Sequence, residues 1–161
     1  MIDYAVAMVG TDTELFRQLM DLAYGQKPPL CMRAARVADL SCERHPELIE
    51  PYLTDMVRQL PKLKDMAVKR VFLHILIRHS WVEDEEALCL MVDTLLLWVR
   101  DDNQAIAVRS YALTILEHIA QVIPELKREI AMVLEEALPF WDSTALQTLG
   151  KKTIKRLMTC K

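Results

Sequence analysis

The chain has 161 residues, of which 52% are apolar, and a formal net charge of −3. This apolar content excludes a mostly disordered chain, and the small negative charge gives no overall attraction to nucleic-acid phosphates. No stretch reaches ~18 consecutive apolar residues, so the sequence predicts no membrane span. With only three glycines, the composition favours long helices joined by short turns.

The first 29 residues predict two helices that cap one end of the fold. A short helix is expected at 3–9, and Gly10 ends it. The segment Thr11-Asp12-Thr13-Glu14 offers an N-cap candidate and acids for the first turn of a second helix, which runs to Tyr24 with Gly25 as its C-terminal glycine. Pro28-Pro29 suit the first turn of the helix that follows.

Prolines then mark a repeat. Pro46 and Pro124 each begin a Pro-Glu-Leu sequence, and they are 78 residues apart. Pro61 and Pro139 each follow the second apolar stripe of a hairpin, again 78 residues apart. Half of this interval is 39, which is close to the ~40–47 residues of known helical-hairpin repeats.

Apolar side chains recur with the same period. The second helices of the three units carry them at i, i+8 and i+12, a spacing typical of one face of a helix: Leu48, Met56 and Leu60, then Ala87, Leu95 and Val99, then Leu126, Leu134 and Leu138. No helix can bury such a stripe alone. The sequence therefore predicts an all-α single domain over 1–161, with repeats at 30–61, 62–100 and 101–139.

The segment 140–161 predicts a closing helix with Ser143 as its N-cap. Its apolar stripe comprises Ala145, Leu146, Leu149, Ile154 and Leu157, and its other face is basic, with Lys151, Lys152, Lys155 and Arg156. A stack of repeats needs a terminal element with a polar outer surface, and this helix meets that need.

The sequence DDNQAIAVRSYALTIL, at 101–116, resembles the first helix of a HEAT repeat. The matching features are an acid at Asp101 or Asp102, Val108 followed by Arg109, and a small residue before an apolar one. KDMAVKRVFLHIL repeats the pattern with Asp65 and Lys69. The resemblance covers about 28–138, and the whole chain looks like small bacterial HEAT-repeat proteins that end in a basic helix.

This resemblance implies a right-handed α-α superhelix, that is, a HEAT-like solenoid of about three hairpins plus terminal helices. It also implies a role in binding a protein or another ligand, and it carries over no catalytic residue. In HEAT stacks the acid and the arginine typically pair between neighbouring repeats. We therefore interpret Asp65, Lys69, Asp101, Asp102 and Arg109 as structural.

No catalytic, cofactor-binding or metal-binding motif is present in the sequence. The four histidines, His45, His74, His79 and His118, show no spacing that demands a shared site. The four cysteines, Cys31, Cys42, Cys89 and Cys160, form no CxxC pair. We therefore expect a non-enzymatic protein without cofactor or metal, and its reduced thiols suggest the cytoplasm.

The second helix of the middle repeat, EEALCLMVDTLLLWV, is apolar nearly all round. Leu97 stands where the sibling repeats have Arg58 and Glu136. The residues that break the pattern in this way are Leu88, Leu90, Leu97 and Trp98. Second helices line the inner surface of HEAT stacks, so an exposed apolar strip there would bind a protein or peptide partner. The alternatives are that the helix is simply buried on both flanks, or that it forms a homodimer.

A nucleic-acid partner is a further alternative, because some DNA glycosylases acting on alkylated bases are short HEAT-like stacks. Such a site needs basic side chains on the inner surface and aromatic groups near the base. The candidates are Arg33, Arg36, Lys69, Arg70, Arg109 and the basic helix, with Trp81, Trp98 and Trp141 for stacking. The second helices are acidic, however, so the charge lies on the wrong helices for a phosphate track.

Overall fold

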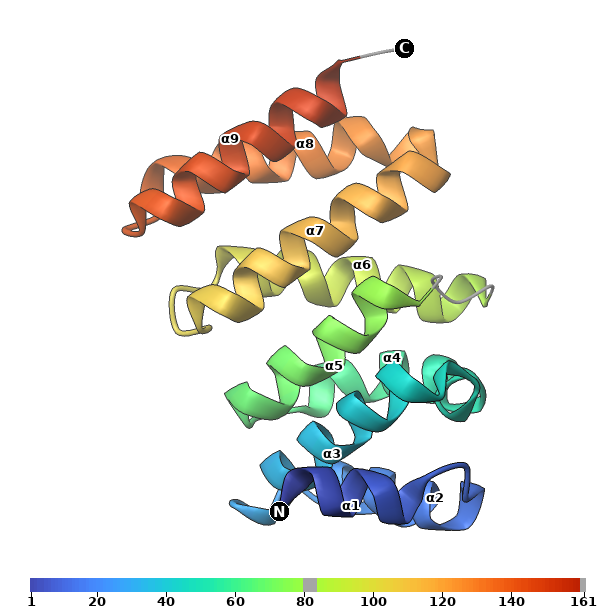
Figure 1. Cartoon of the computed structure of the whole chain (residues 1–161). Coiled ribbons are helices and arrows are strands. Elements are labelled where there is room, and N and C mark those ends of the chain that lie inside the picture. Colours follow the sequence, from blue (N-terminus) through green and yellow to red (C-terminus); the bar gives the residue numbers. More distant parts are fainter. Residues whose placement is uncertain (80–83, 160–161) are drawn as a thin grey trace. The chain divides into compact units, whose positions relative to one another are not determined.

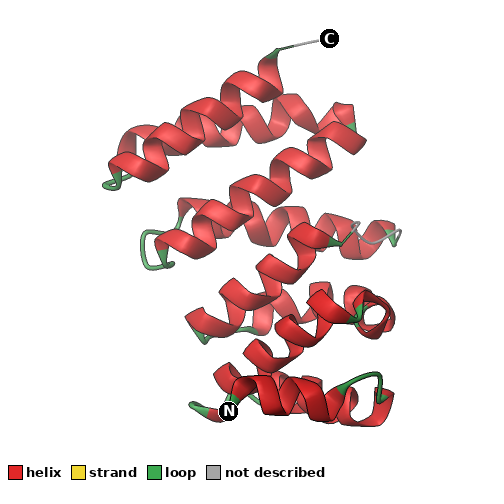
Figure 2. Cartoon of the chain, viewed as in Figure 1, coloured by secondary structure: helices red, strands yellow, loops and turns green. Residues whose placement is uncertain are grey.

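The computed structural model describes residues 1–79 and 84–159, and within these ranges the fold is entirely helical, with short turns and no strand (Figures 1 and 2). The α-helices of these ranges are α1 Ile2–Val9, α2 Thr13–Tyr24, α3 Leu30–Arg44, α4 Leu53–Gln59, α5 Met66–Arg78, α6 Glu85–Arg100, α7 Ile106–Val122, α8 Lys127–Ala137 and α9 Thr144–Met158. The predicted all-α fold is confirmed. None of the described helices is long and apolar enough to cross a membrane.

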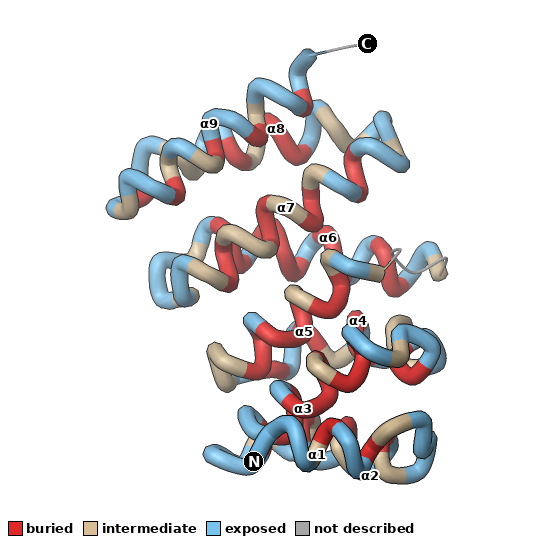
Figure 3. The backbone as a smooth tube through the Cα atoms, in the orientation of Figure 1, coloured by how far each residue is buried: buried red, intermediate tan, exposed pale blue. Residues whose placement is uncertain are grey.

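The chain divides into two compact units, Met1–Leu88 and Cys89–Lys161. In the first unit α3 packs against α1, α2 and α5, and in the second α9 packs against both α7 and α8. Each unit buries the apolar faces of its own helices (Figure 3). The boundary falls inside α6, within the predicted repeat 62–100. The organisation as one domain with repeats at 30–61, 62–100 and 101–139 stays a prediction.

The two Pro-Glu-Leu sequences lie in the same local structure. Each forms a 3₁₀-helix, Pro46–Leu48 and Pro124–Leu126, directly after the long first helix of a hairpin. In each case the residue before the proline donates its backbone N–H to the carbonyl four residues earlier, at 2.8 Å. The proline lacks an N–H and cannot continue the α-helix, so it begins the turn. The 78-residue repeat in sequence is therefore a repeat in structure.

The second pair of prolines behaves in the same way. Pro61 and Pro139 lie in the 3₁₀-helices Leu60–Lys62 and Leu138–Phe140, and each is followed by an extended residue, Leu63 or Trp141. These extended residues lead into the next helix. Both hairpins therefore end in the same way, which supports the predicted positions of the turns.

The second helix of the first repeat departs from the prediction. We expected one helix from Leu48 to Leu60, but it is divided into two 3₁₀-helices, Pro46–Leu48 and Glu50–Tyr52, and the short α4. Pro51 lies inside the second of these and removes a backbone donor that an α-helix would use. The third repeat has Glu129 at this position, and α8 is continuous.

Hydrogen bonds confirm an N-cap at Ser143 and within 11–14, where the structure shows that the capping residue is Asp12. The carboxylate of Asp12 accepts from the backbone N–H groups of Glu14 and Leu15 at 2.9 and 3.0 Å, and Ser143 Oγ accepts from Leu146 at 3.2 Å. Each bond satisfies a donor that has no partner inside the helix. One detail was wrong, because Ala145 of the α9 stripe is exposed.

Gly150 allows α9 to approach its neighbours closely. A Cβ atom added there would lie 2.6 Å from Trp141 Cζ3 and 2.7 Å from Leu138 Cδ1, which is closer than carbon atoms pack. Gly150 and Trp141 are both buried. The absence of a side chain at this position therefore sets the distance between α9 and the end of the preceding hairpin.

We predict that Gly150→Ala destabilises the C-terminal unit by about 1–3 kcal/mol, because the added methyl group overpacks the contact with Trp141. The sign is informative, since alanine in a helix interior is normally favoured over glycine by about 1 kcal/mol. Urea denaturation measures the change. Gly25→Ala is the matched control, because a Cβ atom added at Gly25 would lie 3.4 Å from its nearest neighbours, an ordinary contact distance. A Gly150→Ala protein as stable as the wild type would contradict the packing described.

Candidate binding surfaces

Arg109, on α7, is a buried cation with three partners in the C-terminal unit. Its Nε and Nη2 atoms donate to the backbone carbonyl of Val99 at 3.1 and 3.0 Å, and Nη1 lies 3.3 Å from Asp102 Oδ1. The guanidinium carbon also lies 5.2 Å from the centre of the Trp141 ring, a cation–π distance. Only 4% of Arg109 is exposed. This side chain thus links the end of α6 with α7 and with the segment before α9.

The ion pair of Arg109 lies within one predicted repeat, 101–139, rather than between neighbouring repeats. Its acid, Asp102, lies in the turn just before α7. The contact with the preceding helix is instead the hydrogen bond from Arg109 to the carbonyl of Val99. Asp101 accepts from the backbone N–H of Asn103 at 2.9 Å and shapes that turn. At the equivalent positions of the first unit, Asp65 caps α5 and Lys69 is buried.

We predict that Arg109→Lys lowers the free energy of unfolding by about 1–3 kcal/mol, because an ammonium group cannot reproduce the fork of donors on the Val99 carbonyl. Thermal or urea denaturation measures this loss. Arg128→Lys, at an exposed position of α8, should change stability by no more than about 0.5 kcal/mol. Equal effects of the two substitutions would mean that the contacts of Arg109 contribute little.

A second buried charge lies in the N-terminal unit and was not found from the sequence. Asp39, on α3, is 1% exposed. Its carboxylate accepts from Arg78 at 2.7 Å and from Arg36 at 3.1 Å, and both of its oxygens lie 3.2 Å from Nδ1 of His74. His74 and Arg78 belong to α5, so this cluster connects α3 with α5. A buried carboxylate requires such partners.

The same cluster has the composition of a metal site, but not its electrostatics. Ligand atoms of Asp39, Glu43 and His74 lie within 4.8 Å of one another. However, Arg78 Nη1 lies 2.9 Å from His74 Nδ1 and 3.4 Å from Glu43 Oε1. A guanidinium already stands where a metal cation would bind, and two cations at this distance repel strongly. We therefore assign the cluster to helix pairing.

We predict that Asp39→Asn destabilises the N-terminal unit by about 2–4 kcal/mol, because Arg78 loses the closer and more buried of its two carboxylate partners. Asp21→Asn is the control, since Asp21 forms an exposed pair with Arg17 at 2.6 Å that is worth about 1 kcal/mol at most. Thermal denaturation compares the variants. Added Zn²⁺ should leave the melting temperature of the wild type unchanged, and a rise that depends on Asp39 would overturn this assignment.

The four apolar residues singled out on α6 divide into two pairs. Leu88 and Trp98 are buried, with exposed fractions of 7% and 5%, whereas Leu90 and Leu97 are exposed by 37% and 59%. The expectation that Leu88 and Trp98 belong to an exposed partner-binding strip was therefore wrong. The neighbours of Trp98 at i−3 and i−7, Leu95 and Met91, are buried as well, so Trp98 belongs to the core-facing side of the helix.

Leu90 and Leu97 lie on one exposed face of α6. They are seven residues apart, which is two helical turns or roughly 10 Å, and Asp93 lies exposed between them. The other sides of α6 are covered, whereas these two leucines face solvent, so they have no role in the core of this chain. This pair remains available for a partner.

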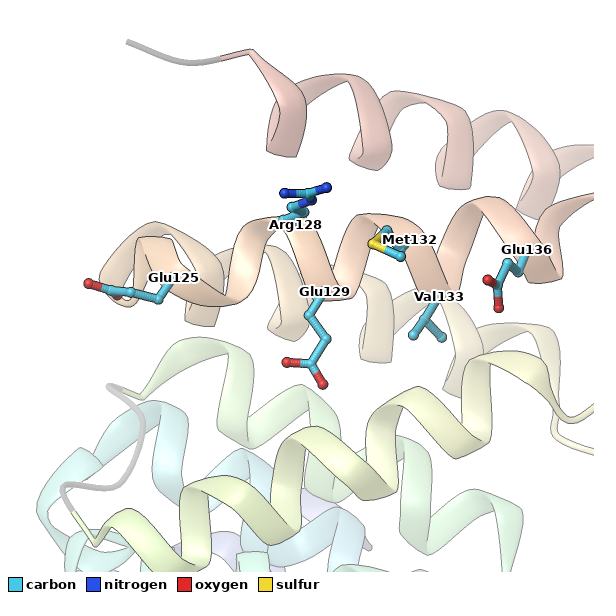
Figure 4. A pocket seen from close by; sticks show the side chains of 6 residues that line it. All are labelled: Glu125, Arg128, Glu129, Met132, Val133 and Glu136. Carbon is cyan, nitrogen blue, oxygen red and sulfur yellow. The ribbon is translucent and has the colours of Figure 1, made fainter.

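The exposed side of α8 carries a shallow pocket of 350 Å³. Met132, which is 51% exposed, and Val133 provide its apolar part (Figure 4). Charged side chains surround them: Glu125, Arg128, Glu129 and Glu136. Figure 4 shows Arg128 and Glu129 projecting from opposite edges of this side of α8. The surface therefore combines a small apolar centre with a mostly acidic rim.

Of the groups that could serve a nucleic acid, Arg33, Arg36 and Arg70 line one groove of the N-terminal unit, but neither described tryptophan candidate is accessible to a base. Lys69 and Arg109 are buried. Trp98 and Trp141 are also buried, by 95% or more, and so cannot stack on bases, whereas Trp81 lies outside the described residues. The basic side chains of α9, Lys151, Lys152, Lys155 and Arg156, are exposed, but Arg156 pairs with Glu117 at 3.3 Å.

The cysteines differ in accessibility. Cys31 and Cys42 are buried, Cys89 is exposed on α6, and Cys160 lies outside the described residues. Burial raises the pKa of the Cys42 thiol to about 12, so it carries almost no thiolate at neutral pH and is a poor nucleophile. Cys42 is therefore part of the core rather than of a reactive site.

A family model described as a HEAT repeat domain matches residues 1–157. The chain belongs to this HEAT repeat family. The resemblance seen over about 28–138 therefore extends to the terminal helices as well. Comparison with curated proteins and with solved structures gives no match. HEAT repeats generally mediate protein interactions, and the family is typically non-enzymatic.

Proposed function

We propose that this HEAT-repeat protein is a non-enzymatic binding module that contacts a protein or peptide through the exposed faces of α6 and α8. The observation that carries the proposal is Leu97, an apolar side chain that is 59% exposed in the last turn of α6, a helix whose other apolar sides are covered. Leu90 extends the same face, and Met132 provides a similar apolar centre on α8.

The charges around these residues indicate the chemistry of the partner. Asp93 stands between the two leucines, and three glutamates, Glu125, Glu129 and Glu136, line the α8 pocket beside Arg128. An apolar contact within an acidic surround favours a segment that carries apolar and basic side chains. The acidic character also weighs against a nucleic acid, since each phosphate would meet like charge.

We predict that the double substitution Leu90→Lys and Leu97→Lys abolishes binding of the partner while the helical content stays unchanged. The substitutions remove two apolar contacts and repel a basic segment, so a loss of at least ~10-fold in affinity is expected. The measurement begins with capture of partners on the immobilised full chain from the cells of origin. Mass spectrometry then identifies the captured protein, and titration with that purified protein follows.

The matched control is Ile106→Lys with Val122→Lys, which places the same charges at two exposed apolar positions of α7 that are 53% and 54% exposed. The control should bind as the wild type does. Equal binding by all three proteins would refute the proposed surface. Sedimentation of the chain alone tests the homodimer, since self-association that disappears in the leucine variant would make a second copy the partner.

A further inference from the structure

A second surface lies in the N-terminal unit, on different helices and with the opposite charge. It is a groove of 890 Å³ between α1, α3 and α5. Val37 and Val71, both buried, contribute to its floor, and the exposed side chains of Ile2 and Met32 contribute to its walls. Figure 1 shows α1 beside α3 near the N-terminus. The groove is larger than the α8 pocket and mainly apolar.

The apolar walls are unusually open to water. Ile2 is 47% exposed and Met32 is 40% exposed, although both stand beside a surface into which they could pack. Methionine is a flexible side chain that adapts to different partners. A concave apolar surface of this size is the kind of site at which another molecule binds.

Three arginines line the groove: Arg33 and Arg36 on α3, and Arg70 on α5. Arg36 donates to the buried Asp39 at 3.1 Å. Arg33 and Arg70 form no ion pair within residues 1–79 and 84–159. The acid of the lining, Asp3, lies 3.9 Å from Arg44. The groove is thus positive, and two of its guanidinium groups are available for an external carboxylate.

We propose that this groove binds an acidic amphipathic helix of a partner protein. The lining follows α3 and α5, with Met32, Arg33, Arg36 and Val37 on one and Ala67, Arg70 and Val71 on the other. Each helix therefore presents apolar side chains with arginine next to them. A helix laid along the groove buries its apolar side chains at i, i+3, i+4 and i+7 spacing, and its flanking carboxylates pair with the arginines, whose fork matches a carboxylate.

Two other classes of partner fit the groove less well. A single-stranded nucleic acid needs aromatic side chains on which its bases stack, and no described residue of the lining is aromatic. An anionic membrane would require apolar side chains that project outward beyond the arginines, whereas buried floor residues such as Val71 lie inside a hollow. An elongated, partly apolar and acidic segment matches both the shape and the charge.

The test uses a fluorescently labelled helical peptide of about 18 residues, with leucine at i, i+3, i+4 and i+7 and glutamate beside the leucines. A second peptide has lysine in place of every glutamate. Fluorescence anisotropy is measured with the full chain at two salt concentrations. The glutamate peptide is expected to bind at least ~10-fold more tightly than the lysine peptide, and its affinity should fall as salt rises.

The variant Arg33→Glu with Arg70→Glu should weaken binding of the glutamate peptide by ~10-fold or more and strengthen binding of the lysine peptide. Lys151→Glu with Lys152→Glu changes the net charge by the same amount at exposed positions of α9 and should leave both affinities unchanged. Met32→Ala should weaken binding of the glutamate peptide at both salt concentrations, because the apolar contact is not screened. Circular dichroism verifies that each variant is folded.

Three results would overturn the proposal: equal binding of the two peptides, equal effects of the two charge-reversal pairs, or binding to anionic lipid vesicles without binding to the glutamate peptide. The proposal would also be overturned if the chain associates with itself and Arg33→Glu with Arg70→Glu abolishes this association. The occupant of the groove would then be a second copy of the chain. The leucine variant of α6 is expected to bind the glutamate peptide normally. Failure of this inference is therefore distinguishable from failure of the surface proposed on α6 and α8.

Discussion

The helices of this chain carry apolar stripes that only neighbouring helices can cover, and covering them places polar groups in the interior. Arg109 and Asp39 show the two ways in which the fold resolves this conflict. Arg109 is buried against a carbonyl, a carboxylate and an indole, and Asp39 is buried against three basic side chains. Both link neighbouring helices. A buried charge without such partners would destabilise the folded state by more free energy than the surrounding apolar contacts contribute.

Local features of the fold were predictable from the sequence because their causes are local. Pro46 and Pro124 cannot donate a backbone hydrogen bond, so each ends the preceding helix and begins a turn at the same place in its repeat. Asp12 caps its helix through bonds to residues two and three positions away. The Asp39 cluster was missed for the opposite reason, since its partners His74 and Arg78 are 35 and 39 residues distant. No short-range pattern reports such a pairing.

The candidate surface on α6 was predictable in part. Comparison with the sibling repeats identified α6 as a helix with apolar residues where the other two repeats have polar ones. Composition alone does not say which side of α6 faces water. Helical geometry groups the residues into sides, because successive residues are about 100° apart, and a charged residue marks the side that faces water. Leu90 and Leu97 therefore share the exposed side with Asp93, whereas Trp98 follows Leu95 toward the core. The charged residue on that side was the signal, rather than the seven-residue spacing, which the buried Met91 and Trp98 share.

The two surfaces proposed here differ in a way that bears on specificity. The face of α6 and α8 surrounds its apolar residues mostly with carboxylates, whereas the groove of α1, α3 and α5 presents arginines. Apolar contact alone discriminates poorly between amphipathic segments, since most of them fit a Met-containing surface. Charge provides the discrimination, because an acidic segment that suits the groove is repelled by the glutamates of α8, and a basic segment by the arginines. The two proposed surfaces therefore favour opposite classes of partner, the groove an acidic segment and the face of α6 and α8 a basic one.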